Sequence, residues 1–175
     1  MRRLHLVRHG LPAFVEGRPP HAWGLDPAGF DAIDALGSSG RLPEHAVWFS
    51  SPEAKALGTA RRLTAGEITV VDDLREQERG PTAWFDDLDE WRGVLRRVFT
   101  QPDVPAMPGW EPLSRTSDRV VAAVRRVLTD HTGDVVLVGH GTAWTALKAA
   151  LTGSAPDLDA WERLQMPDVW VIETP

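Results

Sequence analysis

Short apolar runs recur along the chain and predict the strands of a sheet. Each run is continuous rather than alternating with polar residues, which is typical of strands covered on both faces by helices. The predicted strands are Leu4–Val7, Ala46–Phe49, Ile68–Val71, Val135–Val138 and Val169–Ile172.

Helical patterns separate these runs. Asp26 is a suitable cap for a helix over about Pro27–Leu36, and Ser51 for a helix over about Pro52–Ala65, each with proline at the first helical position. The other predicted helices are Trp84–Phe99, Ser117–Leu128 and Thr142–Leu151. Strands that alternate with helices predict an α/β fold with a mainly parallel sheet. We expect one domain, residues 1–175.

Composition and charge narrow the class of protein. The 175 residues carry a formal charge of −6, which argues against a nucleic-acid partner, because such proteins usually show a basic surplus. The chain has no cysteine and no run of 18 apolar residues, so disulfides, thiolate zinc sites and membrane spans are not expected. The apolar stretch after the first two arginines is too short for an export signal. We therefore expect a cytoplasmic monomer or homodimer.

Two predicted strands run directly into a His-Gly pair. The stretch LHLVRHG ends at His9 and Gly10, and VVLVGHG ends at His140 and Gly141. Ligands of open α/β sheets bind outside the carboxyl ends of the strands, so both histidines are expected in one crevice. The glycines allow the backbone to turn tightly and approach a ligand. Arg8 adds a planar guanidinium that suits phosphate or carboxylate.

A third segment adds positive charge to the predicted crevice. FSSPEAKALGTA carries a strand into a helix start, where unbonded N–H groups favour anions, and Lys55 lies in the first turns. Two imidazoles, an arginine and a lysine fit a tetrahedral dianion. An attacking histidine must be neutral, and an acid must protonate the departing alkoxide. Glu76 in LREQERG is the candidate acid, with Glu78 as the alternative.

These segments resemble the motifs of a known family, the histidine phosphatase superfamily, which includes phosphoglycerate mutases. LVRHG resembles its signature, SSPEAKALGTA is similar to SSxLxRAxxTA, LREQERG to LxExxxG, and PGWEPLSRTSDRV to PGGES…RV. The resemblance implies His9 as the phosphorylated nucleophile and Glu76 as the proton donor. It places Arg8, Lys55 and His140 around the phosphate, with no metal and no cofactor. It also implies a three-layer α/β/α fold like that of phosphoglycerate mutase.

The chain departs from the family pattern at three places. Lys55 replaces an arginine, which removes a bidentate donor and is expected to lower activity. Leu11 and Pro12 replace polar residues after the signature glycine, and Arg18 is a possible source of the missing charge. Trp110 replaces a smaller residue and is expected on the leaving-group side.

Three functions follow from these observations. The leading hypothesis is a metal-independent phosphomonoesterase that acts through a phosphohistidine on a small phosphorylated metabolite or a phosphoprotein. The alternative is a degenerate relative that binds a phosphorylated ligand with little or no catalysis, suggested by Lys55. A phosphoglycerate mutase is less favoured, because mutases of this family are longer than 175 residues.

Overall fold

The computed structural model describes residues 2–80 and 87–174 and contains a five-stranded sheet. The strand order is β3-β2-β4-β1-β5, and β5 is antiparallel to β1 whereas the other pairs are parallel. The strands are β1 Arg2–Arg8, β2 Val47–Ser50, β3 Ile68–Val70, β4 Val135–Gly139 and β5 Asp168–Thr174. The predicted strands and the mainly parallel sheet are confirmed.

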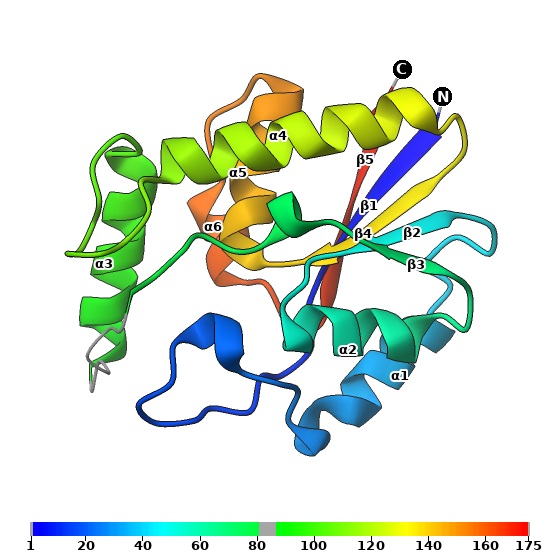
Figure 1. Cartoon of the computed structure of the whole chain (residues 1–175), viewed down its shortest axis with the longest axis horizontal. Helices are drawn as coiled ribbons and strands as arrows, with labels where there is room; N and C mark the ends of the chain where they lie inside the picture. The colour runs from blue at the N-terminus through cyan, green and yellow to red at the C-terminus, as the bar shows by residue number, and fades with distance from the viewer. Residues whose placement is uncertain (1, 81–86, 175) are drawn as a thin grey trace.

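Helices cover both faces of this sheet (Figure 1). One face is covered by α1 and α2, and the other by α4 and α5, while α3 and α6 pack beside the beginning of α4 and against α5. The helices are α1 Phe30–Ser38, α2 Ala54–Leu63, α3 Leu88–Thr100, α4 Leu113–Asp130, α5 Gly141–Thr152 and α6 Leu158–Glu162. Short 3-10 helices are η1 Pro20–Ala22, η2 Pro27–Gly29 and η3 Asp72–Leu74.

The pleat of β1 explains how one strand serves two cores. Leu4 and Leu6 belong to the core under α4 and α5, whereas Val7 belongs to the core under α1 and α2. Successive side chains of a strand point to opposite faces, so a continuous apolar run is needed where both faces are covered. β5 lies at the edge, and its Val171 is 48% exposed.

Several predicted helix boundaries differ from the structure. The helix expected from Pro52 begins at Ala54, and its N-cap is Glu53 rather than Ser51. Asp26 does accept a hydrogen bond from Ala28 N, but it caps the 3-10 turn η2 that leads into α1. The helix expected from Trp84 is present as α3, and the predicted residues 84–86 lie outside the described residues. Helix α6 was not predicted, because five residues are too few to show a periodic pattern.

No helix among residues 2–80 and 87–174 is both long and apolar enough to cross a membrane.

The parallel pairing of β1 with β4 is the feature that builds the site. It sets Arg8 opposite Gly139, so the residues that follow, His9 and His140, leave the sheet side by side at its carboxyl edge.

Candidate active site

His9 continues directly from β1 and is held by backbone bonds. Its N–H donates to Gly139 O at 2.9 Å, and its ring Nδ1 lies 2.7 Å from Gly10 O. A carbonyl oxygen only accepts, so Nδ1 carries the hydrogen and Nε2 keeps a lone pair. Burial and the neighbouring cationic groups hold the pKa of His9 well below its usual value. His9 is therefore a neutral base or nucleophile at neutral pH.

His140 follows β4 and lies against His9. The two ring centroids are 5.3 Å apart. Nε2 of His140 lies 2.8 Å from Ser51 Oγ and 3.4 Å from Glu53 Oε1. His140 is fully buried, and burial lowers its pKa to about 3. Its Nδ1 is buried and has no hydrogen-bond partner among the described residues.

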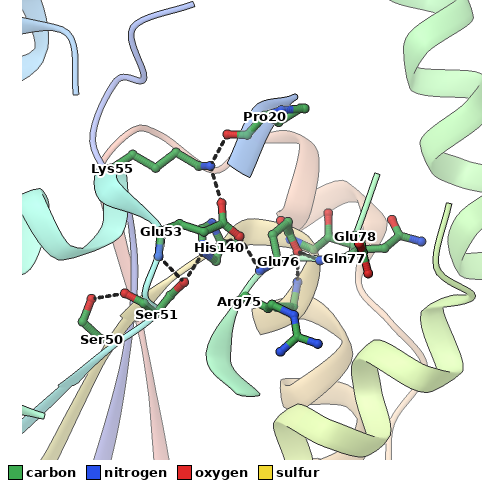
Figure 2. A network of polar contacts seen from close by, with 12 residues as sticks. Pro20, Ser50, Ser51, Glu53, Lys55, Arg75, Glu76, Gln77, Glu78 and His140 are labelled. Carbon is green, nitrogen blue, oxygen red and sulfur yellow. Dashed lines mark hydrogen bonds and ion pairs between the residues drawn. The ribbon is translucent and has the colours of Figure 1, made fainter. Parts of the chain in front are cut away.

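Lys55 is brought to the same site, but it is already paired. Its Nζ lies 2.5 Å from Glu53 Oε2 and donates to Pro20 O at 2.7 Å. Figure 2 shows Glu53 in the centre of this network, between Lys55 and Glu76. Glu53 is 7% exposed and Lys55 is 4% exposed. The site therefore holds a buried carboxylate next to the lysine that was predicted to bind phosphate.

Ser51 has a role that differs from the sequence prediction, and Glu53 contributes to the site although no role was predicted for it. Ser51 does not cap α2; its hydroxyl accepts a hydrogen bond from Glu53 N at 3.3 Å and contacts the His140 ring. Glu53 was missed by the sequence analysis, although an acidic residue two positions before Lys55 was visible in SSPEAKALGTA. Nothing in the local pattern indicated that this carboxylate would turn inward to meet Lys55.

Glu76 lies at the N-terminus of α5, beside the histidines. Oε1 accepts from Ala143 N at 2.9 Å and from Gln77 N at 3.0 Å, and Oε2 accepts from Thr142 N at 3.2 Å. The backbone N–H of Glu76 donates to Glu53 Oε1 at 2.9 Å. The unbonded amides of a helix start favour an acidic group at this position.

Glu78, the alternative acid, is placed differently. Glu78 is exposed. Its backbone N–H donates to the Glu111 carboxylate, and its C=O accepts from Glu111 N. Of the two candidates, only Glu76 has its carboxyl group bonded to the helix that follows His140.

An arginine on α4 holds the segment that carries Glu76. Arg119 donates to Asp73 O at 3.0 Å, to Arg75 O at 2.7 Å and to Glu76 O at 2.7 Å. Its guanidinium also pairs with Glu111, at 2.9 Å. This bonding replaces regular secondary structure in fixing the loop after η3, and it was not predicted from the sequence.

Close packing, rather than an unusual backbone angle, explains the glycine after His9, whereas at Gly141 an added Cβ would make only ordinary contacts. A Cβ on Gly10 would lie 2.6 Å from Ile33 Cδ1, and a Cβ on Gly141 would lie 3.4 Å from Arg8 Nε. Arg8 itself donates to Leu164 O at 2.8 Å, and its Nε has no partner among the described residues. The guanidinium therefore has an unused donor beside the start of α5.

The remaining predicted contacts lie farther out. Arg18 is exposed on the loop after β1, and no described interaction joins its side chain to the site. The loop reaches the site instead through Pro20 O, which accepts from Lys55. Trp110 is 4% exposed and packs beneath Arg79. Arg79 was also missed by the sequence analysis, although it lies in the same LREQERG segment as Glu76.

The described residues offer no group of three or more His, Cys, Asp or Glu side chains placed to hold a metal ion. The groups that gather at this edge of the sheet are two neutral imidazoles, the Arg8 guanidinium, the paired Lys55 ammonium and the start of α5, whose amides bind Glu76. Fold and site together define an α/β protein with two buried histidines and a candidate anion site at the carboxyl edge of its sheet. The chain belongs to the histidine phosphatase superfamily (branch 1), whose family pattern matches residues 4–173.

Individual relatives agree with this assignment. A putative phosphoserine phosphatase 2 from Hydrogenobacter thermophilus is 27% identical over 164 residues, which cover 87% of this chain and 80% of that protein. The structure of YhfR from Bacillus stearothermophilus is 25% identical, with a TM-score of 0.76 over 100% of this chain and 92% of that one. A phosphoglycerate mutase from Bacillus anthracis str. Sterne is 19% identical, with a TM-score of 0.76 over 97% and 86% of the two chains. That last likeness shows the fold alone, and it confirms the phosphoglycerate mutase-like architecture.

Proposed function

We propose that this protein is a metal-independent phosphomonoesterase that works through a phosphohistidine at His9. The observation that carries the proposal is the pair of buried, neutral imidazoles 5.3 Å apart at the ends of two adjacent parallel strands. One of them, His9, has Nδ1 bonded to a carbonyl, which leaves the Nε2 lone pair for attack.

In the first step, Nε2 of His9 attacks phosphorus while the bond from phosphorus to the ester oxygen breaks. Glu76, in its protonated form, gives its proton to the departing oxygen, so that an alcohol leaves. Arg8 and Lys55 stabilise the equatorial phosphoryl oxygens. The first amides of α5 act on the reaction through Glu76, whose carboxyl group they bind. His140 contributes a ring nitrogen to the same phosphoryl group.

In the second step, water attacks the phosphorus of phospho-His9. Glu76, now a carboxylate, accepts a proton from that water, and the bond between phosphorus and Nε2 breaks. Inorganic phosphate and neutral His9 are the products, and Glu76 is again protonated. The same groups therefore serve both steps, in opposite directions of proton transfer.

The substrate class of this proposal is a small phosphorylated metabolite or a phosphoprotein. The relative from Hydrogenobacter thermophilus, a putative phosphoserine phosphatase, supports a small phosphate ester.

The test is hydrolysis of a chromogenic aryl phosphate between pH 5 and 8 with a metal chelator present. We expect activity that resists the chelator and disappears in His9→Ala. A matched control is His21→Ala, which removes an exposed histidine of the loop after β1. Full activity in His9→Ala would refute the proposal. Loss of activity of the unmodified protein when the chelator is added would refute it as well.

A second candidate function is binding of a phosphorylated ligand with little turnover. The observation that favours it is the Glu53 carboxylate, which lies 2.5 Å from Lys55 Nζ and repels an incoming dianion. This candidate predicts that phosphate raises the melting temperature although no ester is hydrolysed. Lys55→Arg then distinguishes the two. A gain in turnover supports a weakened enzyme, and a continued absence of ester hydrolysis supports a protein that only binds the ligand.

A further inference from the structure

We infer that Arg79, which packs against both Trp91 and Trp110, forms a subsite for a second anionic group, a carboxylate on the leaving-group side of the phosphate ester. The inference rests on the proposed function, because it names the part of the substrate that lies beyond the transferred phosphate.

The guanidinium of Arg79 is held in place by two aromatic rings. Its Cζ lies 5.3 Å from the centroid of the Trp91 ring and 5.0 Å from that of the Trp110 ring. The two rings also contact one another edge to face, with centroids 5.9 Å apart. Cation–π contacts with both rings restrain the guanidinium without using its N–H donors.

Most of those donors remain available. Nη2 donates to Thr142 Oγ1 at 3.0 Å and Nε to Gln77 Oε1 at 3.4 Å. Both acceptors are neutral, whereas a guanidinium has five N–H donors. In the described part of the chain, no carboxylate lies within ion-pair distance of Arg79, whereas the half-buried Arg119 is paired with Glu111. Among residues 2–80 and 87–174, Arg79 thus forms no ion pair; burial lowers the pKa of its guanidinium, and the charges of Glu76 and Glu53 only partly oppose this.

Thr142 connects this cation to the reaction. Its hydroxyl accepts from Arg79, and its backbone N–H donates to Glu76 Oε2. Because Glu76 is the proposed proton donor, the departing oxygen of a substrate lies next to Glu76. Arg79 is joined to Glu76 through this one residue, Thr142, so a substrate group next to the departing oxygen lies near Arg79. A guanidinium at that place suits a planar carboxylate, which accepts two parallel hydrogen bonds.

The site would therefore take phosphate at His9 and a carboxylate at Arg79. Two anions on one small molecule match two separate cationic centres. Neutral alcohols and large aromatic leaving groups would use only the first centre.

The experiment compares two substrates that differ only in the carboxylate, O-phosphoserine and O-phosphoethanolamine. For the unmodified protein we expect kcat/KM to be higher for O-phosphoserine. Arg79→Met should lower kcat/KM for O-phosphoserine about 10- to 100-fold, the effect of one charge-assisted bidentate contact. The same variant should change kcat/KM for O-phosphoethanolamine less than about threefold.

Arg75→Met is the matched control. Arg75 lies in the same loop, is partly exposed, and pairs with Asp72 at 2.6 Å, away from the histidines. It should leave the ratio between the two substrates unchanged. Arg79→Lys keeps the charge but not the planar fork, and it should recover only part of the preference.

Two results would overturn the subsite: an unmodified protein with no preference for the carboxylate, or an equal fall on both substrates in Arg79→Met. The phosphatase proposal is tested separately, by comparing hydrolysis of the aryl phosphate by the unmodified protein and by His9→Ala. If no ester is hydrolysed, the affinities of the same two compounds are measured by calorimetry. The subsite then predicts tighter binding of O-phosphoserine that Arg79→Met removes, and equal affinities refute it.

Discussion

The buried pair of Glu53 and Lys55 gives a prediction about stability that does not depend on activity. Both side chains are nearly inaccessible, at 7% and 5% exposure, and their charged atoms are 2.5 Å apart. Lys55→Met removes the cation and leaves a carboxylate buried without its partner. Breaking a buried pair on one side costs about 3–5 kcal/mol, because the remaining charge has lost both water and its counter-ion. We expect Glu53→Gln to fall in the same range.

The double variant separates this cause from ordinary loss of packing. Glu53→Gln with Lys55→Met leaves no charge behind, and the glutamine oxygen can still accept the hydrogen bond from Glu76 N that Glu53 accepts now. Replacement of both members of a buried pair is often neutral. We therefore expect the double variant to be within about 2 kcal/mol of the original protein, more stable than either single variant.

The assay is urea unfolding followed by tryptophan fluorescence, for which the chain has eight tryptophans. A loss of 3–5 kcal/mol corresponds to a fall in Tm of about 6–20 °C for a chain of this size. Arg75→Met is the control, because its surface pair with Asp72 is expected to contribute less than about 1 kcal/mol. A single-variant cost below about 1 kcal/mol, or a double variant whose cost equals the sum of the two, would refute the reasoning.

Three further predictions concern the surroundings of the site. Gly139→Ala would set a Cβ 2.5 Å from Trp144 Cζ2, and we expect it to cost about 1–3 kcal/mol of unfolding free energy. His5→Leu replaces a ring that is 2% exposed and that meets good hydrogen-bond geometry with no described residue, although the Arg41 backbone lies near enough to raise its pKa, and we expect a gain of about 1–3 kcal/mol. Burial lowers the pKa of His5 below 6.5, so the unfolded chain binds a proton more readily, and stability falls as pH drops below about 6.5; His5→Leu should weaken that fall. Arg119→Lys removes donors to the loop of Glu76, and we expect turnover to fall about 10- to 100-fold.

Each of these has a measurement that can contradict it. Gly133→Ala is the control for Gly139→Ala, because nothing lies within 4 Å of its added Cβ; equal unfolding costs for the two would exclude the steric cause. For His5→Leu, unfolding at pH 5 and pH 7 should show a smaller difference than the original protein shows. An Arg119→Lys protein with unaltered kcat would mean that the loop holds its place without this arginine.

Much of the fold was predictable because its signals are local. The apolar run of β4 and that of β1, which only His5 interrupts, reflect burial on both faces, and each ends at a His-Gly pair. Parallel strands bring their carboxyl ends to one edge, so the meeting of His9 and His140 followed from the sequence together with the fold class. Glu76 was found in the same way, from its place after a strand.

The partners of the side chains depended on tertiary packing. Glu53 could have faced solvent at the start of α2, and only the position of Lys55 and the Glu76 backbone shows why it is buried. Arg79 is separated by 12 and 31 residues from the two tryptophans that hold it (91 − 79 and 110 − 79). A contact between residues so far apart leaves no periodic trace in the chain, since periodicity reports only which face of a helix or strand is buried. The sequence by itself determined where the strands end and which histidines meet there. The tertiary structure decided which charges surround those histidines, because a buried charge takes its partner from whichever element is packed against it.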